Sequence, residues 1–479
     1  METRIIYLVA LFFLSLAVPS YSEQLEVGAS CIDVNPKVFP IQLRSGKSNY
    51  VHDPLHVRAV AFQRGEGRAV ICLIDAIGIG RDMSDLAKAR AAEKTGWKPK
   101  EMLICATHTH TAPKGGEGTP GKEAYEKLKH EKLEEAIVKA IQSLQPARVG
   151  FGSDEEPSEV RNRRWFLKEG TMPPNPLGEE DQVKTNANRN HLVKPAGPVD
   201  PELCVIDIRT NRNKPLALIA NYALHYVGGI PKVKEEDGRS VGMASADYFG
   251  EFSRVMPYRI GGSNPPEEFV ALMTNGASGD IINNLVFTGT RAPRSPFEQV
   301  RIVASKAADT AWRAVKKIED YDDKPVVAVL QREVDLPYRK PAKREIILAE
   351  ALLNKSSKER NDINSRTTSV ANRVIEYSGP DHPETEAVLI QAVRIGKQAI
   401  VSMPFEVLVE IGLEIKKKSP FERTFLISLA NKGYGYLPPP NQHKLGGYET
   451  WLGTSRFQPQ SSEILIKQLL EMLDELKKL

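Results

Sequence analysis

The segment Met102-Leu-Ile-Cys-Ala-Thr-His-Thr-His-Thr-Ala-Pro113 joins a short apolar run to a turn that carries two histidines. A continuous apolar run that ends at a turn is typical of a buried strand, so 102–106 is predicted to be one. Residues two apart on extended backbone point the same way, so His108 and His110 can face one site. Ligands of α/β proteins bind beyond the carboxyl ends of strands. In a chain with 9 histidines, this pairing favours a metal or catalytic site over two polar turn residues.

Apolar runs on both sides of this segment alternate with stretches of helical periodicity. Upstream, 57–62 and 69–74 predict two neighbouring strands joined by a turn around Gly65-Glu-Gly67, and 82–94 predicts a helix that ends near Gly96. Downstream, strands are predicted at 203–208, 216–220, 387–395, 398–402 and 424–429, and helices at 122–144, 241–256, 298–318, 343–376 with a break near Asp362, and 463–479. This alternation predicts a layered α/β domain with central β-sheets flanked by α-helices.

The N-terminus has the pattern of a secretory signal peptide. Arg4 supplies a positive charge, 5–18 is almost entirely apolar, and Ser20-Tyr-Ser22 provides small residues two apart. A membrane anchor is disfavoured because the apolar stretch is shorter than the ~20 residues that span a bilayer. We expect 1–22 to be removed and 23–479 to form a single exported domain, periplasmic or extracellular, with no transmembrane segment.

Composition narrows the class of protein. Lys plus Arg is 65 and Asp plus Glu is 61, and this near balance argues against a nucleic-acid partner. The four cysteines have no metal-site spacing; we expect Cys72, Cys105 and Cys204 to be buried thiols, and one disulfide is left open. The segment 168–199 is rich in Pro, Gly and Asn, which predicts either a functional loop or a surface excursion.

Three more predicted strands are followed directly by a residue that can bind a metal. Asn221-Tyr-Ala-Leu-His225 follows 216–220, Met403-Pro-Phe-Glu406 follows 398–402, and Ala430-Asn-Lys-Gly-Tyr-Gly-Tyr436 follows 424–429. Each is a weak signal alone, but the same placement recurs after four predicted strands. The repetition predicts one site assembled from distant parts of the sequence.

These motifs resemble, in the same order along most of the chain, those of the neutral (alkaline, non-lysosomal) ceramidase family. Thr-His-Thr-His resembles that family's metal-binding signature, in which two His, one Glu and one Tyr hold zinc. Carried over position by position, the resemblance implies the zinc ligands His108, His225, Glu406 and Tyr436. It also implies the family's catalytic-domain fold, with mixed β-sheets.

The resemblance assigns further roles around these ligands. His110 would either support a metal ligand or transfer the proton. Arg161-Asn-Arg-Arg164 resembles an Asn-Arg-Ser stretch whose arginine lines the active site, which points to Arg163. We assign Asp280, Asn284 and Tyr434 to substrate binding, with plain packing as the alternative for Tyr434.

The chemistry agrees with these residue types. Catalytic zinc takes imidazole and carboxylate ligands and keeps one position for water, whose pKa falls to about 7. His110 could carry the proton, and Arg163 could stabilise a tetrahedral intermediate. The sequence therefore predicts a secreted zinc-dependent hydrolase that cleaves an amide (or ester) bond with metal-activated water, although the ligand set also accepts other divalent metals.

Two departures from the family pattern leave the substrate open. The family has a serine in a Gly-Asp-Val-Ser-Pro-Asn segment; the aligned position in Gly279-Asp-Ile-Ile-Asn-Asn284 holds Ile282, and Ser278 lies on the other side of the Gly-Asp pair. Family members also carry an immunoglobulin-like domain, which we expect this chain to lack. Two candidate substrates are about equally supported. One is an N-acylsphingosine amide, reached through transient contact with a membrane surface, and the other is a non-lipid amide or ester such as a decorated carbohydrate. A non-catalytic binding protein on the same scaffold is the alternative of another class.

Overall fold

The structure, a computed structural model, describes residues 23–283, 294–355 and 365–479. The predicted signal peptide, Asn284 and the helix break near Asp362 lie outside these residues. Within the described ranges, no helix has the length and apolar character needed to cross a membrane.

A mixed sheet of eight strands forms the centre of the domain. Its middle strands are antiparallel, and its two outermost pairs are parallel. The hairpin expected around Gly65–Gly67 is present. In order across the sheet, the strands are β16 (Val270–Asn275), β13 (Pro215–Tyr222), β12 (Glu202–Thr210), β7 (Gln145–Glu155), β1 (Glu26–Asp33), β4 (His56–Arg64), β5 (Gly67–Ile74) and β6 (Met102–Ala106).

A second sheet of four strands packs on one face of the first. Its strands are β18 (Val327–Pro337), β19 (Thr385–Ile395), β20 (Gln398–Ser402) and β22 (Arg423–Ile427). Alternate side chains of the large sheet, such as Val60 and Phe62, meet Ile400 and Phe425 of the small one in a buried core. The two sheets therefore form the inner layers of the domain.

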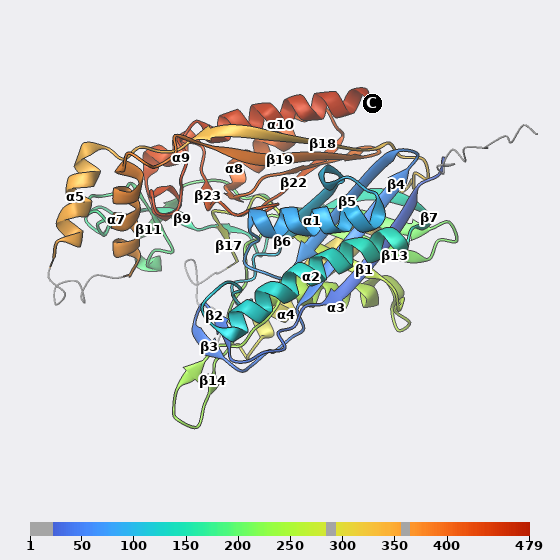
Figure 1. The fold of residues 1–479 in the computed structure, drawn as a ribbon, viewed down its shortest axis with the longest axis horizontal. Helices are drawn as coiled ribbons and strands as arrows, with labels where there is room; N and C mark the ends of the chain where they lie inside the picture. Colours follow the sequence, from blue (N-terminus) through green and yellow to red (C-terminus); the bar gives the residue numbers. More distant parts are fainter. Residues whose placement is uncertain (1–22, 284–293, 356–364) are drawn as a thin grey trace, which may run out of the picture.

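Helices cover both outer faces, so the domain has four layers (Figure 1). The large sheet carries α1 (Arg81–Thr95), α2 (Pro120–Gln142), α3 (Asp247–Gly261) and α4 (Glu298–Lys316). The small sheet carries α5 (Lys343–Leu353), α7 (Ser365–Ser378), α8 (Val409–Lys418) and α10 (Ser461–Lys478), and α10 runs over β18 and β19 at the top of Figure 1. The expected layered α/β architecture is confirmed.

One predicted helix begins later than expected. Residues 241–246 were expected to be helical, but α3 starts at Asp247. Ala244 instead exchanges backbone hydrogen bonds with Tyr50 and His52, and the Ala246 amide donates to Asp53 at 2.8 Å. Pairing with a distant segment outweighs local helical preference here, since propensity is a weak prior.

The two edges of the large sheet approach each other at the end of β22. The Asn275 side-chain amide, at the end of β16, donates to the Thr107 carbonyl just beyond β6 at 3.3 Å. The Ser428 amide donates to the Asn275 carbonyl at 2.9 Å, and the Asn431 amide donates to Ile104 at 2.7 Å. The ends of β6, β16 and β22 therefore meet at one place.

Glycines in β1 and β7 allow helices to lie close to the large sheet. A Cβ atom at Gly28 would lie 2.0 Å from the Ala140 carbonyl oxygen of α2, and one at Gly152 would lie 2.4 Å from that of Ala314 in α4. Glycine at these positions weakens the apolar pattern of both strands, which is why the sequence does not predict them.

We predict that Gly28→Ala lowers the free energy of unfolding by about 1–3 kcal/mol, because β1 and α2 must move apart to accept the methyl group. The measurement is the urea midpoint of the purified protein. Gly78→Ala is the control, since a Cβ there has no neighbour within 4 Å; its midpoint should be unchanged or slightly higher. Equal losses in both variants would show that the close approach is not the cause.

Candidate metal centre

His108 lies just past β6 in a strained backbone conformation. Its φ is 70°, which is uncommon for a residue with a side chain. Its amide donates to the Ala76 carbonyl at 2.9 Å, and its ring Nδ1 lies 2.6 Å from the Ile77 carbonyl oxygen. A carbonyl oxygen can only accept, so Nδ1 carries the proton of the neutral ring. The Nε2 lone pair therefore points into the site.

His225, three residues past β13, is oriented in the same way. Its Nδ1 lies 2.9 Å from the Ser278 carbonyl oxygen, which again places the proton on Nδ1. Burial, followed by the charges of His108, Arg163 and His110, holds the pKa of His225 well below its ordinary value, so the ring is neutral. Its Nε2 is buried and has no hydrogen-bond partner among the residues that the structure describes.

Glu406 and Tyr436 lie opposite each other on two short parallel strands, β21 (Glu406–Val407) and β23 (Tyr436–Leu437). Glu406 Oε2 is 3.3 Å from His108 Nε2 and 3.6 Å from His225 Nε2. This oxygen is buried without a hydrogen bond. Strand β21 packs closely against Gly279, since a Cβ atom there would lie 2.6 Å from the Glu406 carbonyl oxygen.

These three side chains fit a bound cation. Ligands about 2.0–2.1 Å from a tetrahedral zinc ion lie roughly 3.3 Å from one another, close to the two distances from Glu406 Oε2. The His225 Nε2 lone pair and the Glu406 carboxylate oxygen, which face each other without a proton or metal between them, would repel. Leaving such buried groups unsatisfied costs about 1–3 kcal/mol each. The donor set is that of a metal site.

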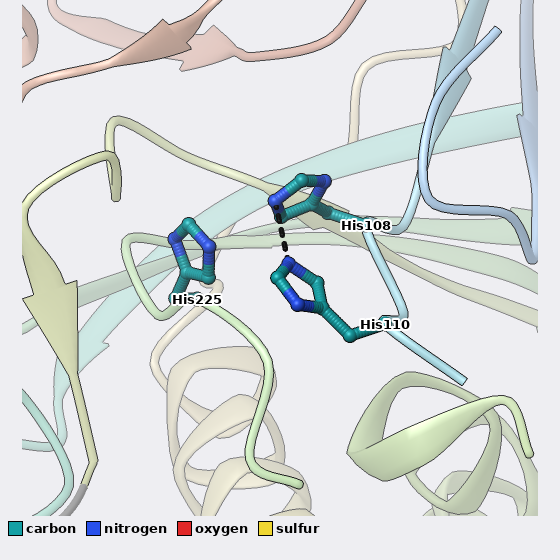
Figure 2. Close-up of side chains that lie close together, drawn as sticks. All are labelled: His108, His110 and His225. Carbon is teal, nitrogen blue, oxygen red and sulfur yellow. Dashed lines mark hydrogen bonds between the residues drawn. The ribbon is translucent and has the colours of Figure 1, made fainter. Parts of the chain in front are cut away.

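His110 reaches the same point from the following turn (Figure 2). The three histidines can each offer a nitrogen within 4.8 Å of the others, and His110 Nε2 is 3.1 Å from His108 Nε2. Its Nδ1, however, is 3.2 Å from Arg44 Nη1, which can only donate. The neutral ring therefore carries its proton on Nε2, and this tautomer cannot bind a metal there.

The charge state of His110 follows from its surroundings. Burial first, and then the charges of His108, Arg44 and Arg163, lower the pKa of His110 to about 2. Its ring stacks on Tyr226 with 3.7 Å between centroids and 15° between planes. His110 is thus a neutral, firmly oriented group beside the candidate ligands.

Arg163 lies directly behind Tyr436. Its Nη2 donates to the Tyr436 hydroxyl at 2.9 Å, and its Nε donates to Glu449 at 2.9 Å. The neighbouring Arg164, fully buried, donates to the other oxygen of Glu449 at 2.7 Å, and the Thr185 hydroxyl binds that oxygen as well. One carboxylate therefore fixes two guanidinium groups, and Arg163 is held against the candidate ligand.

The residues assigned to substrate binding lie elsewhere. Both carboxylate oxygens of Asp280 are already used, by the Asn162 side-chain amide at 2.8 Å and the Val409 backbone amide at 2.9 Å. The Tyr434 hydroxyl donates to Glu386 of β19 at 2.6 Å, in the core of the small sheet. The structure does not bring these two side chains to His108, and Asn284 is outside the described residues.

Ile282 lies in β17 (Ile281–Ile282), paired with β8 (Arg161–Asn162), so it borders the Arg163 segment. The Ser278 hydroxyl donates to the Asn275 side chain at 2.6 Å, and only its carbonyl reaches the site, through His225. The segment 168–199 is partly ordered: β10 (Val183–Thr185) and β11 (Leu192–Pro195) flank β9 (Arg164–Leu167). All four cysteines are free, and three of them are buried as expected.

Sequence reasoning missed the residues that orient the others: Arg44, Tyr226, Glu449 and the carbonyl groups of Ile77 and Ser278. Of these residues, only Glu449 could have been identified from the sequence. Adjacent arginines such as Arg163 and Arg164 need a carboxylate if they are buried, and Glu449 follows an aromatic residue close to the predicted ligand Tyr436.

Two solved structures share this fold. The chain matches a structure of neutral ceramidase from Pseudomonas aeruginosa with a TM-score of 0.69 and 16% identity, covering 95% of this chain and 75% of that one. It matches a structure described as ceramidase complexed with C2 with a TM-score of 0.69, 17% identity and the same coverage. A scan of protein-family models and a search of curated proteins gave no match. The ceramidase-like fold implied by the sequence motifs is confirmed.

Replacing Glu449 by Gln should lower the free energy of unfolding by about 3–5 kcal/mol, because two buried guanidinium groups lose the carboxylate that they share. Chemical denaturation of the variant and the parent protein measures this. Glu333→Gln, which removes the half-exposed partner of Arg81, is the matched control and should cost about 1 kcal/mol or less. A small loss for Glu449→Gln, similar to the control, would contradict the described role.

Proposed function

We propose that this protein is a hydrolase that uses a zinc ion to cleave an amide or ester bond. The observation that carries the proposal is the convergence of two imidazole Nε2 atoms and one carboxylate oxygen at a buried point. The shared fold with ceramidases supports the hydrolase class. The imidazole and carboxylate donors support zinc, which prefers such ligands in catalytic sites.

His108, His225, Glu406 and Tyr436 would hold the metal. His108 and His225 offer Nε2, and Glu406 offers Oε2. Burial raises the pKa of Tyr436 well above its ordinary value, whereas the positive charge of Arg163 acts in the opposite direction and favours the phenolate. His110 is left out of this set because Arg44 holds its proton on Nε2.

When bound, zinc would supply a water of lowered pKa and a Lewis acid beside the substrate carbonyl. His110 would move the proton at Nε2. This requires that Arg44 leave Nδ1, which both permits the other tautomer and removes one of the charges that hold the pKa of His110 low. The same atom would then return the proton to the leaving group. Arg163, fixed by Glu449, would stabilise negative charge on the carbonyl oxygen as the tetrahedral intermediate forms.

Two substrate classes fit the proposal. An N-acylsphingosine-type amide is suggested by the ceramidases that share the fold. A non-lipid amide or ester is favoured by the polar groups that surround His110, namely Arg44, Tyr226 and Arg163. A binding protein without activity is the alternative of another class, and a purified protein that holds no zinc would favour it.

We also propose that residues 1–22 are a signal peptide and that the protein is exported as one domain. The charged start, the apolar run and the small residues at 20 and 22 support this.

Purified protein supplied with zinc should bind about one zinc ion per chain, as a single catalytic site requires. The His108→Ala/His225→Ala double variant should lose it, together with hydrolysis of whichever of the two substrate classes the parent protein cleaves. Elemental analysis measures the metal. His191→Ala, in the short helix η2 (Arg189–His191), is the control and should keep both metal and activity. A double variant that binds as much zinc as the parent would refute the assigned ligands.

A further inference from the structure

Two basic side chains from separate parts of the chain lie around the candidate metal centre. Arg44, in the turn between β2 (Ile41–Leu43) and β3 (Gly46–Ser48), contacts His110 at 3.2 Å. The Arg366 guanidinium of α7 lies 4.7 Å from the ring centroid of Tyr448, whose ring is 5.4 Å from that of the candidate ligand Tyr436. We call Arg44 and Arg366 the basic rim.

The basic rim has no acidic partner in the part of the chain that the structure describes. Arginines elsewhere on the surface are commonly paired: Arg81 with Asp85 and Glu333, and Arg313 with Asp154. Arg44 instead donates to a neutral imidazole, and Arg366 lies over an aromatic ring. The positive charge of the rim is therefore not balanced by the described carboxylates.

Two buried arginines behind the basic rim add to the excess of positive charge. Arg163 and Arg164 share the single carboxylate of Glu449. Burial and the charge of Glu406 raise the pKa of the Tyr448 phenol, and the guanidinium groups of Arg366, Arg163 and Arg44 oppose that rise. The charges of three arginines from different elements thus reach one phenol beside Tyr436.

We propose that the substrate of this site carries a negative charge on a group near the scissile bond, and that Arg44 and Arg366 bind that group. The inference rests on the proposed hydrolase function and narrows its substrate to a small amide or ester that bears a carboxylate or a comparable anion. Guanidinium groups match such anions with paired hydrogen bonds, and an entrance of one sign raises the local concentration of oppositely charged substrate. A neutral N-acylsphingosine would leave the rim unpaired.

Binding of matched hydroxamates to the zinc-loaded protein tests this without turnover. A hydroxamate binds zinc in place of an amide. The probes are the monohydroxamic acids of succinic, glutaric, adipic and suberic acid, each compared by calorimetry with the analogue whose far carboxylate is a primary amide. At one chain length or more, the acid should bind about tenfold tighter than its amide, the value of one charge-assisted hydrogen bond. Added salt should reduce this preference.

The variants Arg44→Gln and Arg366→Gln identify the residues responsible. Both side chains are exposed, so both variants should fold and keep their zinc. Each should lower the preference for the acid severalfold, and Arg366→Gln, which does not contact the candidate ligands or His110, should leave the affinity for the amide unchanged. Arg212→Gln removes the same charge from an exposed turn before β13, at the opposite end of that strand from His225, and should keep the full preference.

Each contrary outcome has a distinct meaning. Equal affinity for acid and amide at every length would overturn the anionic substrate and leave the hydrolase standing. A preference that survives in both rim variants would overturn the assignment to Arg44 and Arg366. Failure of the protein to hold zinc, or of every hydroxamate to bind the zinc-loaded protein, would refute the proposed function and this inference with it.

Discussion

The site depends on the meeting of the two edges of the large sheet at the end of β22. Asn275 and Thr107 join the edges by a side-chain hydrogen bond of 3.3 Å, and Ser428 binds the same asparagine through its backbone. Strands β6 and β16 are the outermost of eight, so their ends would be far apart in a flat sheet. Their meeting is what brings His108 and His225 together, although 116 residues of chain lie between them.

Two carbonyl groups then determine what the site can do. They hold the protons of His108 and His225 on Nδ1, so both Nε2 lone pairs face Glu406. Such an arrangement is unfavourable unless a cation lies between the groups. His110 differs from the two candidate ligands because its Nδ1 faces Arg44, which leaves the proton of the neutral ring on Nε2. The hydrogen-bond partner of each Nδ1 therefore determines which of the three histidines can bind a metal through Nε2.

The sequence predicts the fold best where strands are continuously apolar, as in β5, β6 and β20. It does not predict β1 and β7. Gly28 and Gly152 in these strands let helices lie close to the sheet, and this need for glycine arises only from packing in the folded chain. Residues just past strand ends could be predicted. The structure gathers His108, His225 and Glu406 around one point and places Tyr436 opposite Glu406. The groups that orient these residues could not be predicted, because backbone carbonyls and a glutamate such as Glu449 give no recognisable pattern in the sequence. Asp280 was assigned by position in a motif, and the structure shows its carboxylate engaged with Asn162 and Val409.

The central claim is that a metal ion satisfies the facing lone pairs of His108, His225 and Glu406. A crystal structure of the zinc-loaded protein, with anomalous data collected on both sides of the zinc absorption edge, tests it most directly. The account predicts one anomalous peak about 2.0–2.2 Å from His108 Nε2, His225 Nε2 and Glu406 Oε2, with Tyr436 as the fourth protein ligand and His110 outside the coordination sphere. No peak at this point, or a peak bound by His110 in place of Glu406, would contradict it.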